Sequence, residues 1–127
     1  MAMLSEKANR DPAPATLAPA AALFHSLADP TRLAIVQRLT EGEARVVDLT
    51  RRLDLAQSTV SAHLACLREC GLVQGRPEGR QMFYSLARPE LLDLLAAAEN
   101  LLAATGNAVA LCPNYGTDAA ARTGVHQ

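Results

Sequence analysis

Three cysteines are the residues of this chain best suited to chemistry. Cys66 and Cys70 are four positions apart, and Cys112 lies near the C-terminus. If the first two share a helix, their side chains project from one face, about 6 Å apart along its axis. An odd number of cysteines argues against a disulfide scaffold and favours metal binding or thiol chemistry.

Two thiolates with this spacing can hold one large, soft ion, but they leave its coordination shell incomplete. Cys112 is the only further thiol in the chain, so a site built from sulfur alone needs it. Three sulfur ligands prefer Cd(II) to Mg, Mn or Ni. Zn(II) usually takes four nitrogen or sulfur donors, and His63, three positions before Cys66, is the candidate for a fourth donor.

Other interpretations of the thiols stay open. Cys66 and Cys70 are also compatible with small apolar side chains buried at the end of a helix, and Cys112 with an incidental thiol. A redox switch would pair Cys112 with Cys66 or Cys70, because two cysteines four apart on one helix form a strained disulfide at best.

The segment that carries the first two thiols begins with polar side chains suited to a groove. They are Gln57, Ser58, Thr59 and Ser61. Val60, Leu64 and Leu67 follow at the spacing of a buried helix face. The segment therefore predicts a helix with a polar front, an apolar side and two thiols at its back.

The remaining chain predicts four further helices and one β-hairpin. The helices cover about 16–28, 30–40, 46–53 and 89–105, and Asp29-Pro30 is a strong start signal for the second. Strands at 72–76 and 81–86 flank a turn at 77–80. The predicted fold class is mainly α with a small β-hairpin wing, a winged helix-turn-helix in the order α-α-α-α-β-β-α.

Three segments are expected: a flexible N-terminal arm (1–14), a DNA-binding and dimerisation domain (15–105), and a C-terminal tail (106–127) that carries a candidate metal ligand. The last helix has a wider apolar stripe than one small domain needs. We therefore expect a homodimer, although burial in the chain's own core would also explain the stripe.

Charge is distributed unevenly along the 127 residues. Residues 45–88 contain seven arginines against four acidic residues, whereas the net charge of the whole chain is −1. A positive block around the polar-fronted helix fits a nucleic-acid surface. No membrane span, signal peptide or catalytic motif is apparent, so we expect a cytoplasmic protein that is not an enzyme.

The combination of motifs resembles the ArsR/SmtB family of winged helix-turn-helix repressors. The resemblance rests on Leu27–Arg32, on Ser58–Leu64, on Leu67 with Gly71–Val73, and on Glu78–Arg80 with Tyr84. It implies a homodimer formed by the first and last helices, binding to a palindromic double-stranded operator, and release from DNA when metal binds.

Two metal sites common in this family are absent here. The segment 43–49, which matches the helix that carries a Cys-x-Cys in arsenic sensors, has no thiol, and the last helix has no histidine. The remaining set of Cys66, Cys70 and Cys112 resembles the cadmium- and lead-sensing CmtR-type branch. That similarity adds Pb(II) to Cd(II) as an expected effector, with Zn(II) as a further candidate.

The expected DNA-binding residues come from the polar front and from basic side chains beside it. Sequence preference is assigned to Gln57, Ser61 and His63, and phosphate contact to hydroxyl groups such as those of Ser58 and Thr59. The basic residues expected at the DNA backbone are Arg51, Arg52, Arg76 and Arg80. The sequence thus predicts a metal-responsive repressor, with a thiol redox sensor or a constitutive DNA-binding protein as alternatives.

Overall fold

The computed structural model describes residues 14–111. A short 3₁₀ helix, η1 (Pro14–Leu17), leads into the elements α2 (Ala18–Leu27), α3 (Pro30–Leu39), α4 (Val46–Leu53), α5 (Gln57–Glu69), β1 (Val73–Glu78), β2 (Gln81–Leu86) and α6 (Glu90–Ala104). This order confirms the predicted winged helix-turn-helix. The expected N-terminal arm, apart from Pro14, lies outside the described residues.

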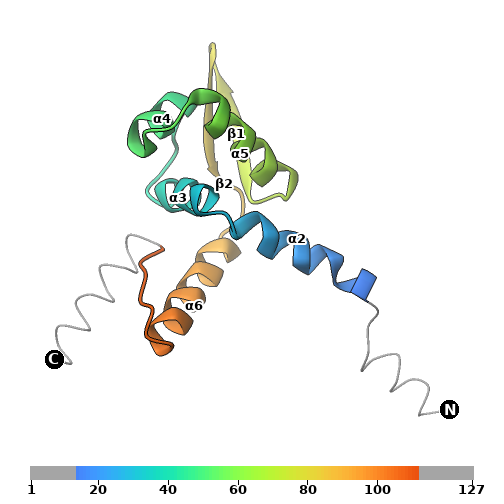
Figure 1. The fold of residues 1–127 in the computed structure, drawn as a ribbon. Coiled ribbons are helices and arrows are strands. Elements are labelled where there is room, and N and C mark those ends of the chain that lie inside the picture. The colour runs from blue at the N-terminus through green and yellow to red at the C-terminus, as the bar shows by residue number, and fades with distance from the viewer. Residues whose placement is uncertain (1–13, 112–127) are drawn as a thin grey trace.

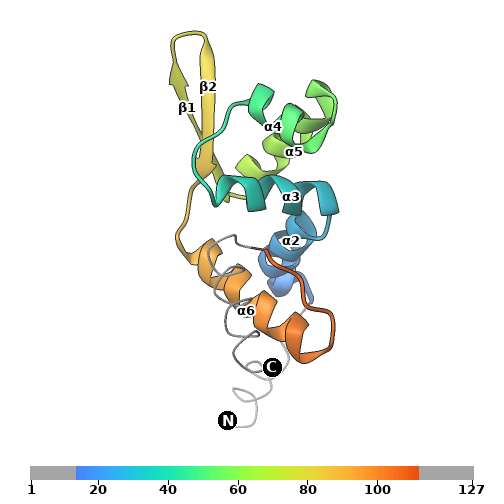
Figure 2. The same ribbon diagram turned by 90° about the vertical axis from the view of Figure 1, so that its left-hand side faces the viewer.

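The helices are arranged in two groups that meet at α3 (Figures 1 and 2). α4, α5 and the β1–β2 hairpin lie on one side of α3, and α2 and α6 lie on the other. The fully buried side chains of α3, α4 and α5 form the centre of the core, and they are Ile35, Val36, Leu49, Val60, Leu64 and Leu67. α5 is thereby packed along one face and open along the other.

Local signals explain where the helices begin and end. The Asp29 carboxylate accepts hydrogen bonds from the backbone N–H groups of Thr31 (2.7 Å) and Arg32 (3.1 Å), which caps α3 as predicted. Gly71 has a φ of +75° after α5, and Leu72 N–H bonds to the Leu67 carbonyl at 3.0 Å. This Schellman arrangement ends α5 at Glu69, with Cys70 as its C-cap residue.

The hairpin differs from the prediction in its turn. β1 continues through Pro77 and Glu78, so that Pro77 pairs with Met82 and only Gly79 and Arg80 form the turn. β1 is the edge strand, since β2 also forms a bridge to Ala44, and proline is tolerated on such an edge. The positive φ of Gly79, +63°, fits the first position of a type II′ turn.

Candidate nucleic-acid interface and thiol site

α4 and α5 form the helix-turn-helix. The turn between them depends on Asp54, which adopts the left-handed conformation with a φ of +56°, and the Leu55 N–H bonds to the Thr50 carbonyl at 3.2 Å. Aspartate tolerates this conformation better than most residues. The turn directs α5 away from α4 with its first residues at the surface.

The predicted front of α5 is open. Gln57, Ser58 and Ser61 are exposed, and Thr59 and His63 are half-buried, whereas Val60 and Leu64 on the inner face are buried. None of the side chains at 57, 58, 59 and 61 forms a hydrogen bond within the described part of the chain. Their donors and acceptors are therefore available to a ligand outside the protein.

The N-terminus of α5 has no side-chain cap, unlike that of α3. Ala56 occupies its N-cap and supplies no side-chain hydrogen bond, whereas Asp29 caps α3. At α4 the Asp48 carboxylate accepts the Arg45 backbone N–H at 2.9 Å. Free amide groups at a helix N-terminus favour an anion such as a DNA phosphate.

The arginines predicted at the DNA backbone fall into two classes. Arg52 bonds to Glu41 at 2.7 Å, and Arg76 bonds to Glu43 at 2.8 Å and to Glu78 at 2.6 Å. The hydrogen bond to Glu43, and to a smaller extent the one to Glu78, raises the pKa of Arg76 above its ordinary value. Arg51 and Arg80 form no ion pair with residues 14–111, so their charges are uncompensated.

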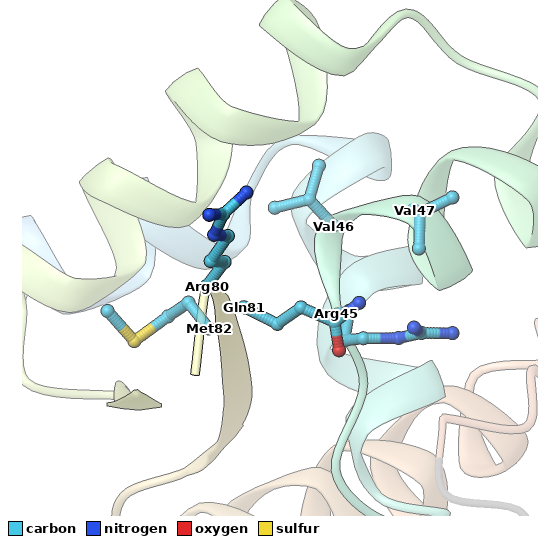
Figure 3. Close-up of a pocket in the computed structure, with 6 residues that line it drawn as sticks. All are labelled: Arg45, Val46, Val47, Arg80, Gln81 and Met82. Carbon is cyan, nitrogen blue, oxygen red and sulfur yellow. The ribbon is translucent and has the colours of Figure 1, made fainter. Parts of the chain in front are cut away.

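Arg80 stands at the tip of the wing, beside a cavity of about 290 Å³ between the wing and the start of α4 (Figure 3). Its lining residues are Arg45, Val46, Val47, Arg80, Gln81 and Met82. Arg45 forms an ion pair with Asp48 at 2.9 Å. The hydrogen bonds that the Arg45 side chain and backbone donate to Asp48 lower the pKa of this carboxyl group to about 2. Arg80 is therefore the uncompensated charge of this surface.

His63 is held from inside the protein. Its Nδ1 lies 3.2 Å from a terminal nitrogen of Arg32 on α3. Because a guanidinium group can only donate, this ring nitrogen accepts the hydrogen bond. The engaged Nδ1 weakens the case for His63 as a fourth metal donor and leaves its other ring nitrogen free.

The two described thiols lie at the C-terminal end of α5. Cys66 is half-buried, Cys70 is exposed, and both are free thiols. The Cys70 sulfur lies 2.7 Å from the hydroxyl oxygen of Ser26 on α2. Neither cysteine is a fully buried core residue, so packing alone does not account for its position. Sulfur is the donor atom that soft metal ions prefer.

The third predicted ligand, Cys112, lies outside the described residues. Within residues 14–111 no group of three His, Cys, Asp or Glu side chains is placed to hold a metal ion. The structure places Cys66 in the last turns of α5 and Cys70 at its C-cap, and the described chain ends at the residue before the third predicted ligand.

The end of the described chain returns to the domain. Gly106, with a φ of +82°, reverses the chain after α6. The Gln37 side chain then donates to the Ala110 carbonyl at 2.8 Å, and the Leu111 N–H donates to the buried carboxylate of Glu99. Residues 107–111 are therefore anchored beside α3 and α6 before Cys112.

The sequence interpretation missed Ser26, Arg32 and Glu99 as site-related residues. Ser26 and Glu99 are the two buried polar side chains of the described chain, at 3% and 9% exposure. In the sequence, each is a polar residue among the apolar residues of a predicted helix. That pattern could have indicated a buried polar side chain. Their partners, however, are far away in sequence and were not predictable from spacing.

The comparisons with known proteins point to one family. The model of the bacterial regulatory proteins of the arsR family matches residues 29–74. A protein of Streptomyces lividans named "Probable mercury resistance operon repressor" is 37% identical over 92 residues, which are 72% of this chain and 74% of that protein.

The transcriptional regulator CmtR of Mycobacterium tuberculosis is 48% identical over 71 residues, covering 56% of this chain and 60% of the relative. The solution structure of this cadmium metal-sensor has a TM-score of 0.53 at 45% identity, covering 61% of this chain and 80% of that one.

A homodimeric winged helix-turn-helix DNA-binding domain, Mb0332 from Mycobacterium bovis, has a TM-score of 0.65 at 31% identity and covers 72% of this chain and 84% of its own. None of the described helices is long and apolar enough to cross a membrane. The matched family consists of transcription regulators, which confirms the prediction that the chain is not an enzyme. With its helix-turn-helix, its wing and these relatives, the chain belongs to the ArsR family of bacterial transcriptional repressors.

Proposed function

We propose that this repressor binds operator DNA as a homodimer and is released when Cd(II) or Pb(II) binds Cys66, Cys70 and Cys112. The observation that carries the proposal is the position of Cys66 and Cys70 on the helix whose front, Gln57–Ser61, is open to DNA. A ligand at one end of this helix acts on the same rigid element that reads the groove.

The proposed dimer uses apolar side chains of α2 and α6 that the monomer leaves exposed. Phe24 is 60% exposed and Leu101 is 66% exposed, and a partner subunit docked on α2 and α6 would cover both side chains. The related Mb0332 domain is homodimeric. A two-fold symmetric dimer presents two copies of α5, so we expect a palindromic operator.

The metal assignment follows from the donor atoms. Thiolates select soft ions, and the CmtR relative is a cadmium sensor. Zn(II) would need a fourth donor. Because the thiols must lose their protons to bind metal, affinity for Cd(II) is expected to increase with pH.

We further propose that Cys112 completes the site of the partner subunit. Ala110 is bonded to Gln37 near the C-terminal end of α3, whereas Cys70 contacts Ser26, which precedes the N-terminal end of α3. Gln37 lies seven residues after the start of α3, about 10 Å along the helix, and the two residues from Ala110 to Cys112 advance the chain by at most about 7 Å. Figure 1 shows the end of the described tail and α2 at opposite ends of α3.

The first experiment measures binding of a fluorescent operator by anisotropy, with and without Cd(II), Pb(II), Zn(II) and Ni(II). We expect tight binding without metal and release by Cd(II) and Pb(II). A parallel Cd(II) titration should show sulfur-to-metal charge-transfer absorbance that falls in Cys112→Ser. Release by mild peroxide but by none of the metals would support the redox alternative, and no response to either would identify a constitutive DNA-binding protein.

Mixed dimers decide where Cys112 acts. A Cys112→Ser chain is combined with a Cys66→Ser/Cys70→Ser chain. If the ligand crosses the dimer, the mixed dimer contains one complete three-sulfur site, although neither homodimer has any. If each chain completes its own site, the mixed dimer binds Cd(II) no better than the two homodimers.

A further inference from the structure

Ser26 links the thiol end of α5 to α2. Its hydroxyl group is almost fully buried, at 3% residue exposure, and lies 2.7 Å from the Cys70 sulfur. A buried hydroxyl without a partner is costly. The Cys70 thiol therefore satisfies a polar group that the surrounding apolar side chains of α2 cannot.

Arg32 joins the same place to the front of α5. Its Nε donates to the Ser26 carbonyl at 2.6 Å, and one terminal nitrogen donates to the His25 carbonyl at 3.2 Å. The other terminal nitrogen reaches His63 Nδ1 at 3.2 Å. Arg32 thus holds the last turn of α2 and the middle of α5 at the same time.

We propose that Ser26 and Arg32 are positioning residues that couple the Cys70 thiol to the DNA-facing side of α5. This inference rests on the proposed function, because it concerns how binding at Cys70 is transmitted. The Ser26 hydroxyl holds the sulfur in the metal-free protein and competes with any ion for it. The backbone of the same residue anchors Arg32, which orients His63.

The contact with Arg32 also determines which nitrogen of His63 carries the proton. Since the guanidinium donates to Nδ1, the neutral ring is protonated on Nε2. Nε2–H is a donor, and acceptors for it are the phosphate oxygens or the N7 and O6 atoms of guanine. His63 is therefore prepared to donate to DNA while the Arg32 contact is intact.

Withdrawal of the Cys70 sulfur leaves the Ser26 hydroxyl without its partner. In the proposed coupling the end of α2 shifts when Ser26 loses this partner, and the Ser26 carbonyl shifts with it. Arg32 is bonded to that carbonyl, so the position of His63 changes as well. A coupling between two sites requires a second arrangement of these contacts in the metal-bound protein, and the variants below test for it.

The test compares Ser26→Ala and Arg32→Lys with the native full-length protein. Operator affinity is measured with and without saturating Cd(II), and Cd(II) affinity by competition with a chelator. We expect Ser26→Ala to bind Cd(II) about fivefold more tightly, which is the equivalent of one hydrogen bond. Cd(II) lowers the operator affinity of the native protein by some factor, and in Ser26→Ala the logarithm of this factor should be at most half of its native value. Ser26→Thr, which keeps the hydroxyl, should retain native coupling.

Arg32→Lys keeps the charge but cannot hold two carbonyls and His63 together. It should weaken metal-free operator binding about fivefold with unchanged Cd(II) affinity. Matched controls are Arg38→Lys on the same helix, where Arg38 donates to the Gly42 carbonyl at 3.1 Å, and Ser85→Ala in the wing. Both should behave as the native protein in all three measurements.

Native Cd(II) affinity together with native coupling in Ser26→Ala would overturn the inference, as would equal effects of Arg32→Lys and Arg38→Lys. Failure of the proposed function has a different signature, because the native protein itself would then bind no Cd(II) or would not be released by it. The native control and the variants therefore separate the two outcomes.

Discussion

The two ends of α5 differ in how firmly the protein holds them. At the N-terminal end, Gln57, Ser58 and Ser61 are exposed and form no side-chain hydrogen bond with the described residues, and Ala56 provides no cap. At the C-terminal end, Cys70 bonds to Ser26 and a Schellman turn at Gly71 fixes the chain. α5 is thus open at the end proposed to contact DNA and tied at the end proposed to bind metal.

This difference teaches how one helix can serve two functions. The open end leaves polar groups unsatisfied, and DNA can satisfy them without competition from the protein. At the tied end the Cys70 sulfur already has the Ser26 hydroxyl as a partner, and in the proposed coupling a metal ion competes with that hydroxyl for the sulfur. Variants at the two ends should therefore separate operator affinity from metal affinity.

The largest effect is expected from removal of the thiols. Cys66→Ser/Cys70→Ser should lose Cd(II) affinity by more than about 100-fold, since ligands contribute more than the outer-shell residues that orient them. Operator affinity without metal should stay within about threefold of native, because the hydroxyl introduced by Cys70→Ser can still bond to Ser26 and the residues at the open front of α5 are unchanged. Chelator competition and anisotropy measure the two quantities, and a comparable loss in both would remove the distinction between the two ends.

The opposite pattern is expected at the open end. Gln57→Ala and Ser61→Ala should each weaken operator binding by about 5- to 100-fold if the side chain contacts bases, while Cd(II) affinity remains native. Anisotropy with the operator and with a scrambled duplex measures the loss of preference. Equal weakening on both duplexes would assign the residue to phosphate rather than to base recognition.

Arginine variants sharpen the description of the DNA-facing surface. Arg80→Ala should reduce the slope of log affinity against log salt by about 1, as expected for one phosphate contact. Arg76→Ala should reduce it less, because Glu43 and Glu78 already neutralise that guanidinium. Operator titrations across a salt series give both slopes, and a larger change for Arg76 would mean that DNA displaces its carboxylates.

The smallest effect concerns Asp48, whose pKa is about 2 instead of 3.8 because it accepts hydrogen bonds from the Arg45 side chain and backbone. A lowered carboxyl pKa stabilises the folded state at pH values above the ordinary pKa of the group. This contribution is lost as the pH falls through about 2. Asp48→Asn should therefore lower the melting temperature slightly at pH 7 but not near pH 2. Calorimetry at both values measures the difference. Cd(II) affinity should not change, because Asp48 lies on α4 and the proposed metal site lies at the C-terminal end of α5.

The order of elements was accessible from the sequence because its signals are local. Asp29-Pro30 marks the start of α3, Gly71 marks the end of α5, and the spacing of Val60, Leu64 and Leu67 defines the buried face of α5. The wing was predicted with its turn two residues too long, since Pro77 was interpreted as a turn residue although an edge strand tolerates it.

The candidate site was predicted less completely. The polar front and the thiol pair follow from spacing within one helix. However, Arg52 is paired with Glu41, and Arg76 with Glu43 and Glu78. Of the four arginines predicted to contact the DNA backbone, this leaves Arg51 and Arg80 without an ion pair among residues 14–111. Charge counted along a sequence cannot distinguish a paired arginine from a free one.

The sequence by itself determined the fold class, the polar front of α5 and the placing of Cys66 and Cys70 on one element, because all of these depend on residues within about one helix length of each other. Only the tertiary structure decided that Ser26 holds Cys70, that Arg32 orients His63, and that Gln37 and Glu99 anchor the chain before Cys112. These contacts join residues 12 to 73 positions apart, and no local pattern encodes such a pairing.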